Sequence, residues 1–134
     1  MIAREAACAC GELRLKCEGD PVRISMCHCL ECQRRTGSVF GVQAWFPYER
    51  VELTHGAVKQ FARRGDSGGM VTFNFCPQCG GAVFWRADQR PGLTTIAVGS
   101  FADPAFAKPT ISVWESRKHA WTGPMGEPEI EHSQ

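Results

Sequence analysis

The chain has 134 residues and a formal net charge of +1, and hydrophobic residues make up 43% of it. This length is typical of one domain with one modest core, which excludes a large two-domain enzyme. The apolar fraction excludes an intrinsically disordered chain, and the near-neutral charge provides no overall field that would attract nucleic acid. We therefore expect a single domain over residues 1–134, with its core at about 8–121, and no nucleic-acid partner.

Short segments of alternating apolar and polar residues, bounded by Gly, Pro or Asp, predict β-strands. They cover residues 11–17, 39–46, 51–55, 71–75, 82–85, 94–98 and 111–114. Residues 30–35 predict a helical turn, and no segment has a sustained 3.6-residue apolar period. The sequence therefore predicts a mainly β fold of small antiparallel sheets, with the cysteines in turns between strands.

Two segments lack the features of regular structure. Residues 63–69 contain three glycines and predict an exposed loop, and residues from 123 onward predict an extended, partly disordered tail. Neither the N-terminal segment nor any later run has the apolar length that a signal peptide or a spanning helix needs. We therefore expect a cytoplasmic location and no membrane partner.

Seven of the eight cysteines fall into three tight groups. The first group is Cys8 and Cys10, the middle group is Cys27, Cys29 and Cys32, and the last group is Cys76 and Cys79. A disulfide framework suits neither this spacing nor a chain without an export signal. Thiolates at this spacing on tight turns bind one metal ion, and zinc favours tetrahedral sites built from two such pairs. Iron also binds four cysteines, so zinc is favoured over iron without being fixed by the spacing.

The last group is the most specific, because Pro77 fixes the entry to its turn and Gly80 lets the backbone approach the sulfurs. If the first group completes this half-site, the middle group keeps three ligands and an open fourth position, the arrangement of catalytic zinc. An alternative pairs two cysteines of the middle group with the last group and makes the first group incidental. Further alternatives are purely structural metal, or reduced cysteines without metal.

Three motifs in chain order resemble a known family. They are Cys-x-Cys-Gly at 8–11, Cys-His-Cys-x-x-Cys-x-Arg-x-Thr-Gly-Ser at 27–38, and Phe-Cys-Pro-x-Cys-Gly at 75–80. Together with a closing segment that contains tryptophan, they resemble the glutathione-dependent formaldehyde-activating enzyme family, which includes centromere protein V. The resemblance runs from about Cys8 to Trp121, nearly the whole chain.

The resemblance implies a β-tent fold with two zinc ions per chain, one structural and one catalytic. The implied structural ligands are Cys8, Cys10, Cys76 and Cys79, and the implied catalytic ligands are Cys27, Cys29 and Cys32. The family activity is that of a carbon–sulfur lyase acting in the synthetic direction, which adds glutathione to formaldehyde to give S-(hydroxymethyl)glutathione. The expected partners are therefore a small thiol such as glutathione and a small aldehyde.

A three-thiolate zinc site suits a soft thiol ligand, whose thiolate remains nucleophilic toward an aldehyde carbonyl. Arg34 and Arg35 would offset the negative charge and bind a substrate carboxylate, with solvated helix-turn residues as the alternative. Thr36 and Ser38 would offer hydroxyl and N–H groups to the substrate, or simply end the turn. The alternative functions are a non-enzymatic zinc-stabilised binding module and an iron tetrathiolate electron carrier.

Overall fold

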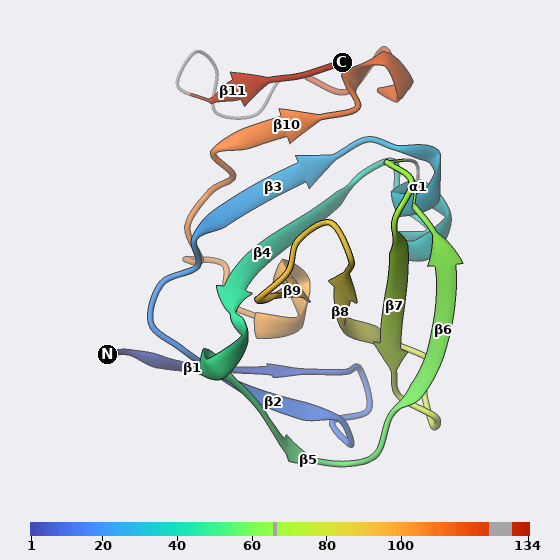
Figure 1. Ribbon diagram of the computed structural model, residues 1–134. Coiled ribbons are helices and arrows are strands. Elements are labelled where there is room, and N and C mark those ends of the chain that lie inside the picture. The colour runs from blue at the N-terminus through green and yellow to red at the C-terminus, as the bar shows by residue number, and fades with distance from the viewer. Residues whose placement is uncertain (66, 124–129) are drawn as a thin grey trace.

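Strands dominate the computed structural model, which describes residues 1–65, 67–123 and 130–134 (Figure 1). The smaller of its two sheets is antiparallel, with the strand order β1 (Ala3–Ala7), β2 (Arg14–Glu18) and β5 (Val51–His55). The larger sheet has the order β11 (Glu131–His132), β10 (Ile111–Val113), β3 (Arg23–Cys27), β4 (Gly41–Pro47), β9 (Leu93–Ala97), β8 (Ala82–Ala87), β7 (Met70–Phe75) and β6 (Lys59–Arg64). The mainly β class predicted from the sequence is confirmed.

The larger sheet is mixed and strongly curved. Strand β10 runs parallel to both β3 and β11, and the remaining neighbours are antiparallel. In Figure 1 this sheet bends from β11 and β10 at the top of the view round to β7 and β6, and β1, β2 and β5 close the bottom. Three short 3₁₀ turns complete the regular structure, η1 (Tyr48–Arg50), η2 (Val98–Phe101) and η3 (Glu115–Arg117).

The two faces of the central strands have different environments, because successive side chains of a strand point to opposite faces. On one face, Ile24, Ala44 and Ile96 belong to the hydrophobic core, together with Leu15 and Cys17 of the smaller sheet. On the other face, the alternate residues of β3 and β4 line a cavity. Burial of one face of β3 and β4 in the core therefore determines which of their side chains face the cavity.

The helix α1 (Leu30–Thr36) connects β3 to β4 and has a distinct cap at each end. At its start, the Sγ atom of Cys29 accepts a hydrogen bond from the backbone N–H of Cys32 at 3.3 Å. At its end, Gly37 has φ +72°, and its N–H donates to the carbonyl of Gln33 at 2.8 Å. The helical turn predicted over residues 30–35 is therefore confirmed and extends by one residue.

The structure corrects the expected loop at 63–69, because Arg63 and Arg64 are the last residues of β6. The sequence also did not predict β1, β3, β6 or β11 as strands. Strand β3 has the sequence Arg-Ile-Ser-Met-Cys, in which polar and apolar residues alternate over only five positions, and this short signal was missed. In the expected tail, residues 124–129 lie outside the described part of the chain, and β11 pairs with β10.

Within the described residues, every helix is too short or too polar to cross a membrane.

Candidate metal centres and the adjoining cavity

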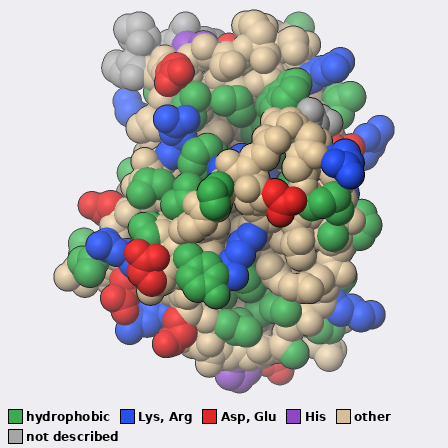
Figure 2. Space-filling model, viewed as in Figure 1, with side chains coloured by type: hydrophobic (Ala, Val, Ile, Leu, Met, Phe, Trp, Pro, Cys, Tyr) green, Lys and Arg blue, Asp and Glu red, His purple; other side chains and the backbone are tan. Residues whose placement is uncertain are grey.

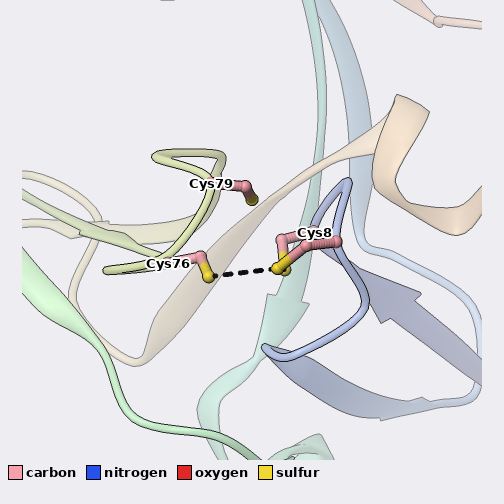
Figure 3. Close-up of side chains that lie close together, drawn as sticks. Cys8, Cys76 and Cys79 are labelled. Atoms are coloured by element: carbon pink, nitrogen blue, oxygen red, sulfur yellow. Dashed lines mark hydrogen bonds between the residues drawn. The ribbon is translucent and has the colours of Figure 1, made fainter.

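Four cysteines from two turns converge at one point between the sheets. Cys8 and Cys10 follow β1, and Cys76 and Cys79 lie in the turn between β7 and β8. All four Sγ atoms lie within 4.8 Å of one another. Figure 3 shows Cys8, Cys76 and Cys79 approaching from these turns, which lie far apart in the sequence. We call this set the four-cysteine cluster.

Backbone N–H groups surround the sulfurs of the four-cysteine cluster. The N–H of Leu13 donates to Cys8 Sγ at 3.2 Å, and the N–H of Gln78 donates to Cys76 Sγ at 3.3 Å. Backbone N–H groups of both turns also lower the pKa of Cys79 to about 6. These donors favour the thiolate form, which is the form that binds metal.

The middle group of cysteines forms a second, separate cluster. Cys27 is the last residue of β3, Cys29 caps α1, and Cys32 lies in the first turn of that helix. All three side chains are buried, and their Sγ atoms lie within 4.8 Å of one another. Trp114, which has a φ of +56°, packs against them. We call this set the three-cysteine cluster.

Among the three thiols, Cys29 is the one whose surroundings most favour ionisation. Hydrogen bonds from the thiols of Cys27 and Cys32, with backbone N–H groups of α1, lower the pKa of Cys29 to about 2. The same hydrogen bonding raises the pKa of Cys27 well above its usual value. The cluster is therefore arranged to stabilise a thiolate at the start of the helix.

His28 does not join the sulfurs, although it lies between two of them in the sequence. Its Nε2 atom lies 3.2 Å from Ser112 Oγ, and burial lowers the pKa of the imidazole. Both features favour a neutral imidazole that is hydrogen-bonded to a hydroxyl and is not a metal ligand. His55 and His119 also lie outside both groups of converging ligand atoms, and their ring nitrogens contact Glu12 O and Gln33 Oε1.

The donor sets of both clusters fit zinc. A tetrahedral ion with Zn–S bonds of about 2.3 Å separates its sulfurs by about 3.8 Å. The Sγ atom of Cys10 lies 3.6 Å from those of both Cys8 and Cys76. The sulfurs of Cys8 and Cys10 lie with those of the Cys76 turn, and the sulfurs of Cys27, Cys29 and Cys32 lie together. This grouping contradicts the alternative in which two cysteines of the middle group join the Cys76 turn.

A cavity of about 360 Å³ adjoins the three-cysteine cluster, and all three cysteines line it. Alternate residues of β3, β4, β7, β8 and β10 form its walls, including Ser25, Gln43, Val71, Ala87 and Val113. This volume is in the range that holds a small organic ligand. A small molecule in the cavity would therefore lie beside the three-cysteine cluster.

Four arginines line the cavity, and each stacks on an aromatic ring. The Cζ atoms of Arg35 and Arg63 lie 4.3 Å from the ring centre of Trp85 and 5.2 Å from that of Phe73. The rings hold the guanidinium groups in place and shield them from water. The other two, Arg90 and Arg23, both stack on Trp45, at 4.7 and 5.4 Å. Among the described residues that line the cavity there is no Asp or Glu side chain.

Of the four residues expected to bind substrate, Arg35 alone is among the described residues that line this cavity. The exposed Arg34 pairs with Glu31 at 2.9 Å on the outer side of α1. Thr36 Oγ1 donates to Cys32 O at 2.8 Å and accepts from the N–H of Ser38 at 3.0 Å, so this pair ends the helix.

The cavity residues that sequence reasoning missed are Arg23, Gln43, Trp45, Arg63 and Arg90. On β4, Gln43 is a polar residue among apolar neighbours, and this polar position was the available sign that one face of the strand lines a cavity. The arginines come from three different parts of the chain, so no local motif contains them.

Comparison with known proteins identifies the family. The family model described as glutathione-dependent formaldehyde-activating enzyme matches residues 3–117. A Fusarium vanettenii protein that carries the same family name is 27% identical over 118 aligned residues, which cover 79% of this chain and 62% of the relative. The chain thus spans less than two thirds of that relative's length.

A crystal structure of a Rhodobacter sphaeroides protein is similar in fold. The TM-score is 0.60 at 18% sequence identity, over 75% of this chain and 91% of that chain. The fold is therefore one that has been solved before. Because the family model covers most of the residues, from β1 through η3, the chain belongs to the glutathione-dependent formaldehyde-activating enzyme family.

Proposed function

We propose that this protein adds a small thiol, with glutathione as the first candidate, to a small aldehyde such as formaldehyde. This reaction is that of a carbon–sulfur lyase acting in the synthetic direction. The observation that carries the proposal is the three-cysteine cluster at the wall of the cavity. Among the described residues, no fourth His, Cys, Asp or Glu lies within ligand distance of these three sulfurs. Family membership supports the same activity.

Cys27, Cys29 and Cys32 would hold a zinc ion that supplies, when bound, a position for a thiol sulfur and lowers the pKa of that thiol. In the addition, the sulfur lone pair forms the carbon–sulfur bond, and the π pair of the carbonyl moves to its oxygen. The thiol loses one proton and the oxygen gains one. The reaction therefore balances without an oxidant, a reductant or a further co-reactant.

The chain's own residues contribute charge and exclusion of water. Three thiolates and an incoming thiolate gather negative charge, and Arg35 and Arg90 line the same cavity to offset it. The rings of Trp45 and Trp85, on which these arginines stack, replace water around the guanidinium groups. An electrostatic interaction is stronger in such a dry environment than in solvent.

The four-cysteine cluster has a different proposed role. It would hold a structural zinc ion, because its four thiols complete a tetrahedron and leave no position for a substrate. Such an ion would fix the β1–β2 turn to the β7–β8 turn.

The distribution of surface charge supports a small-molecule partner over nucleic acid. The formal net charge is +1. On the face seen in Figure 2, Lys and Arg side chains alternate with Asp and Glu side chains instead of gathering into one basic patch. A nucleic-acid interface would need a continuous basic surface.

Metal counting tests the two sites. Mass spectrometry of the intact protein is expected to find two zinc ions per chain, and Cys29→Ser and Cys76→Ser are each expected to lose a different one. One ion per chain after zinc reconstitution would contradict the two-site proposal. Iron in place of zinc would favour an electron carrier.

Thiol binding and turnover test the reaction. Glutathione is expected to change the visible absorption of the cobalt-substituted protein, and Cys29→Ser should abolish this change. NMR exchange measurements should then show faster formation of S-(hydroxymethyl)glutathione from glutathione and formaldehyde than in the uncatalysed mixture. An unchanged rate and spectrum would favour the binding module.

A further inference from the structure

Four buried polar atoms have no hydrogen-bond partner among the described residues and belong to side chains that line one cavity. They are Arg35 Nη2, Gln43 Oε1, Trp45 Nε1 and Arg90 Nε. A buried polar group without a partner costs about 1–3 kcal/mol, so such groups are rare and need an explanation. Their collection around the cavity beside the three-cysteine cluster indicates that a ligand supplies the partners.

The backbone holds three of these side chains in fixed places. Gln43 and Trp45 are alternate residues of β4 and therefore point to the same face. Arg90 lies in the turn between β8 and β9. There its backbone N–H donates to the carbonyl of Ala87 at 3.0 Å, and its backbone carbonyl accepts from the N–H of Leu93 at 3.3 Å. Its guanidinium group stacks on Trp45. The three groups are thus positioned before any ligand arrives.

Arg90 is a cation without an acidic partner in the described part of the chain. Two other arginines near α1, Arg34 and Arg63, pair with Glu31 at 2.9 and 3.4 Å. Among the described residues, no such pair involves Arg90. Burial lowers the pKa of its guanidinium group, and the sulfurs of the nearby cysteines offset only part of this effect. Arg90 is half-buried with its Nε atom fully buried, and a guanidinium in such surroundings is stabilised by a carboxylate, which it binds through paired N–H groups.

Building on the proposed thiol addition, we propose that Arg90, Trp45 and Gln43 form a specificity-determining subsite for thiols that carry a carboxylate beside an N–H donor. The N–H groups of Arg90 and Trp45 donate to the carboxylate oxygens. Gln43 Oε1 accepts the N–H of the ligand. A neutral alkanethiol such as ethanethiol satisfies neither requirement and leaves these groups without partners.

The carboxylate part is tested with two matched probes on zinc-loaded protein. N-acetylcysteine has the thiol, the carboxylate and the N–H, and its methyl ester lacks the charge. By titration calorimetry, the protein is expected to bind the acid roughly 10- to 100-fold more tightly than the ester. Arg90→Gln should reduce this ratio about tenfold. Arg90→Lys, which keeps the charge, should restore part of it.

Arg86→Gln is the matched control. Arg86 lies on β8 and also stacks on an aromatic ring, with its Cζ atom 3.9 Å from the ring centre of Tyr48, but it is not among the residues that line the cavity. The ratio for this variant is expected to equal that of the unmodified protein. If removal of any aromatic-stacked arginine had a general effect, the acid-to-ester ratio would fall equally in Arg86→Gln and Arg90→Gln.

The N–H part is tested with 3-mercaptopropionate, which has the thiol and the carboxylate but no N–H. The protein is expected to prefer N-acetylcysteine over this probe by about 2- to 10-fold. Gln43→Leu should abolish the preference and leave the discrimination between acid and ester in place. A preference that persists in Gln43→Leu would overturn this assignment.

The outcomes separate this proposal from the proposed function. An acid-to-ester ratio near one, or an unchanged ratio in an Arg90→Gln protein with unaltered circular dichroism, would overturn the subsite. N-acetylalanine has the carboxylate and the N–H but no thiol. Binding of N-acetylalanine that depends on Arg90, with no response of the cobalt spectrum to N-acetylcysteine, would support the subsite and refute thiol addition at the three-cysteine cluster.

Discussion

The four-cysteine cluster should stabilise the fold more than the three-cysteine cluster, because it joins distant parts of the chain. Cys10 and Cys76 are 66 residues apart in the sequence, with their Sγ atoms 3.6 Å apart. The three-cysteine cluster lies within one segment, residues 27–32. If each metal acts as a cross-link, loop-closure entropy gives about 4 kcal/mol for the long loop and about 2 kcal/mol for the short one.

Two matched double variants test this difference, since each removes two thiols from one cluster. For a chain of 134 residues, 1 kcal/mol corresponds to a change of about 3.5 °C in Tm. The Tm of zinc-loaded C76S/C79S is therefore expected to fall by about 15 °C, and that of C29S/C32S by about 7 °C. Differential scanning calorimetry measures both. An equal or larger loss in C29S/C32S would refute the cross-link argument.

Two further predictions concern a turn and an ion pair. A Cβ on Gly56, which has φ +87°, would overlap Glu12 O, so Gly56→Ala should cost about 2 kcal/mol or more in urea denaturation. Gly92→Ala, at φ +77° in open space, should cost only about 1 kcal/mol, and equal losses would contradict the packing argument. Burial opposes ionisation of Glu115, but a 2.8 Å contact with His132 outweighs it and lowers the carboxyl pKa from its ordinary value of 4.5. The contribution of Glu115 to the free energy of unfolding is therefore present above pH 4.5 and is lost as the pH falls through the folded-state pKa. The loss of unfolding free energy caused by Glu115→Gln should then shrink in acid, and a loss that stays constant would argue against the ion pair.

The grouping of the cysteines was predictable because short sequence spacing limits their geometry. Cys76 and Cys79 lie between two segments that were predicted as strands, so their turn and its glycine were evident from the local pattern. The same holds for Cys29 and Cys32, where a helical turn over 30–35 was expected. Local sequence pattern was therefore sufficient to predict which cysteines of each turn lie close together.

The cavity was not predictable in the same way, because it depends on the order of strands in the larger sheet. Arg23, Arg63 and Arg90 come from β3, β6 and the turn before β9, and their meeting requires the complete order of strands from β3 to β6. Arg63 also lies in a segment that was expected to be a loop. Periodicity in one strand carries no information about its neighbours in space.

Strands β3 and β4 contribute one face to the core and the other to the cavity. The residues available to a ligand therefore depend on the pairing register of these two strands. A slip of one residue would turn Gln43 toward the core and bring Ala44 to the cavity, because side chains alternate. The same slip in β3 would expose Ile24 and bury Arg23. Burial of the apolar side chains opposes both exchanges. The core therefore holds Gln43 and Trp45 in place on the cavity side of β4, and their polar atoms remain available for a ligand.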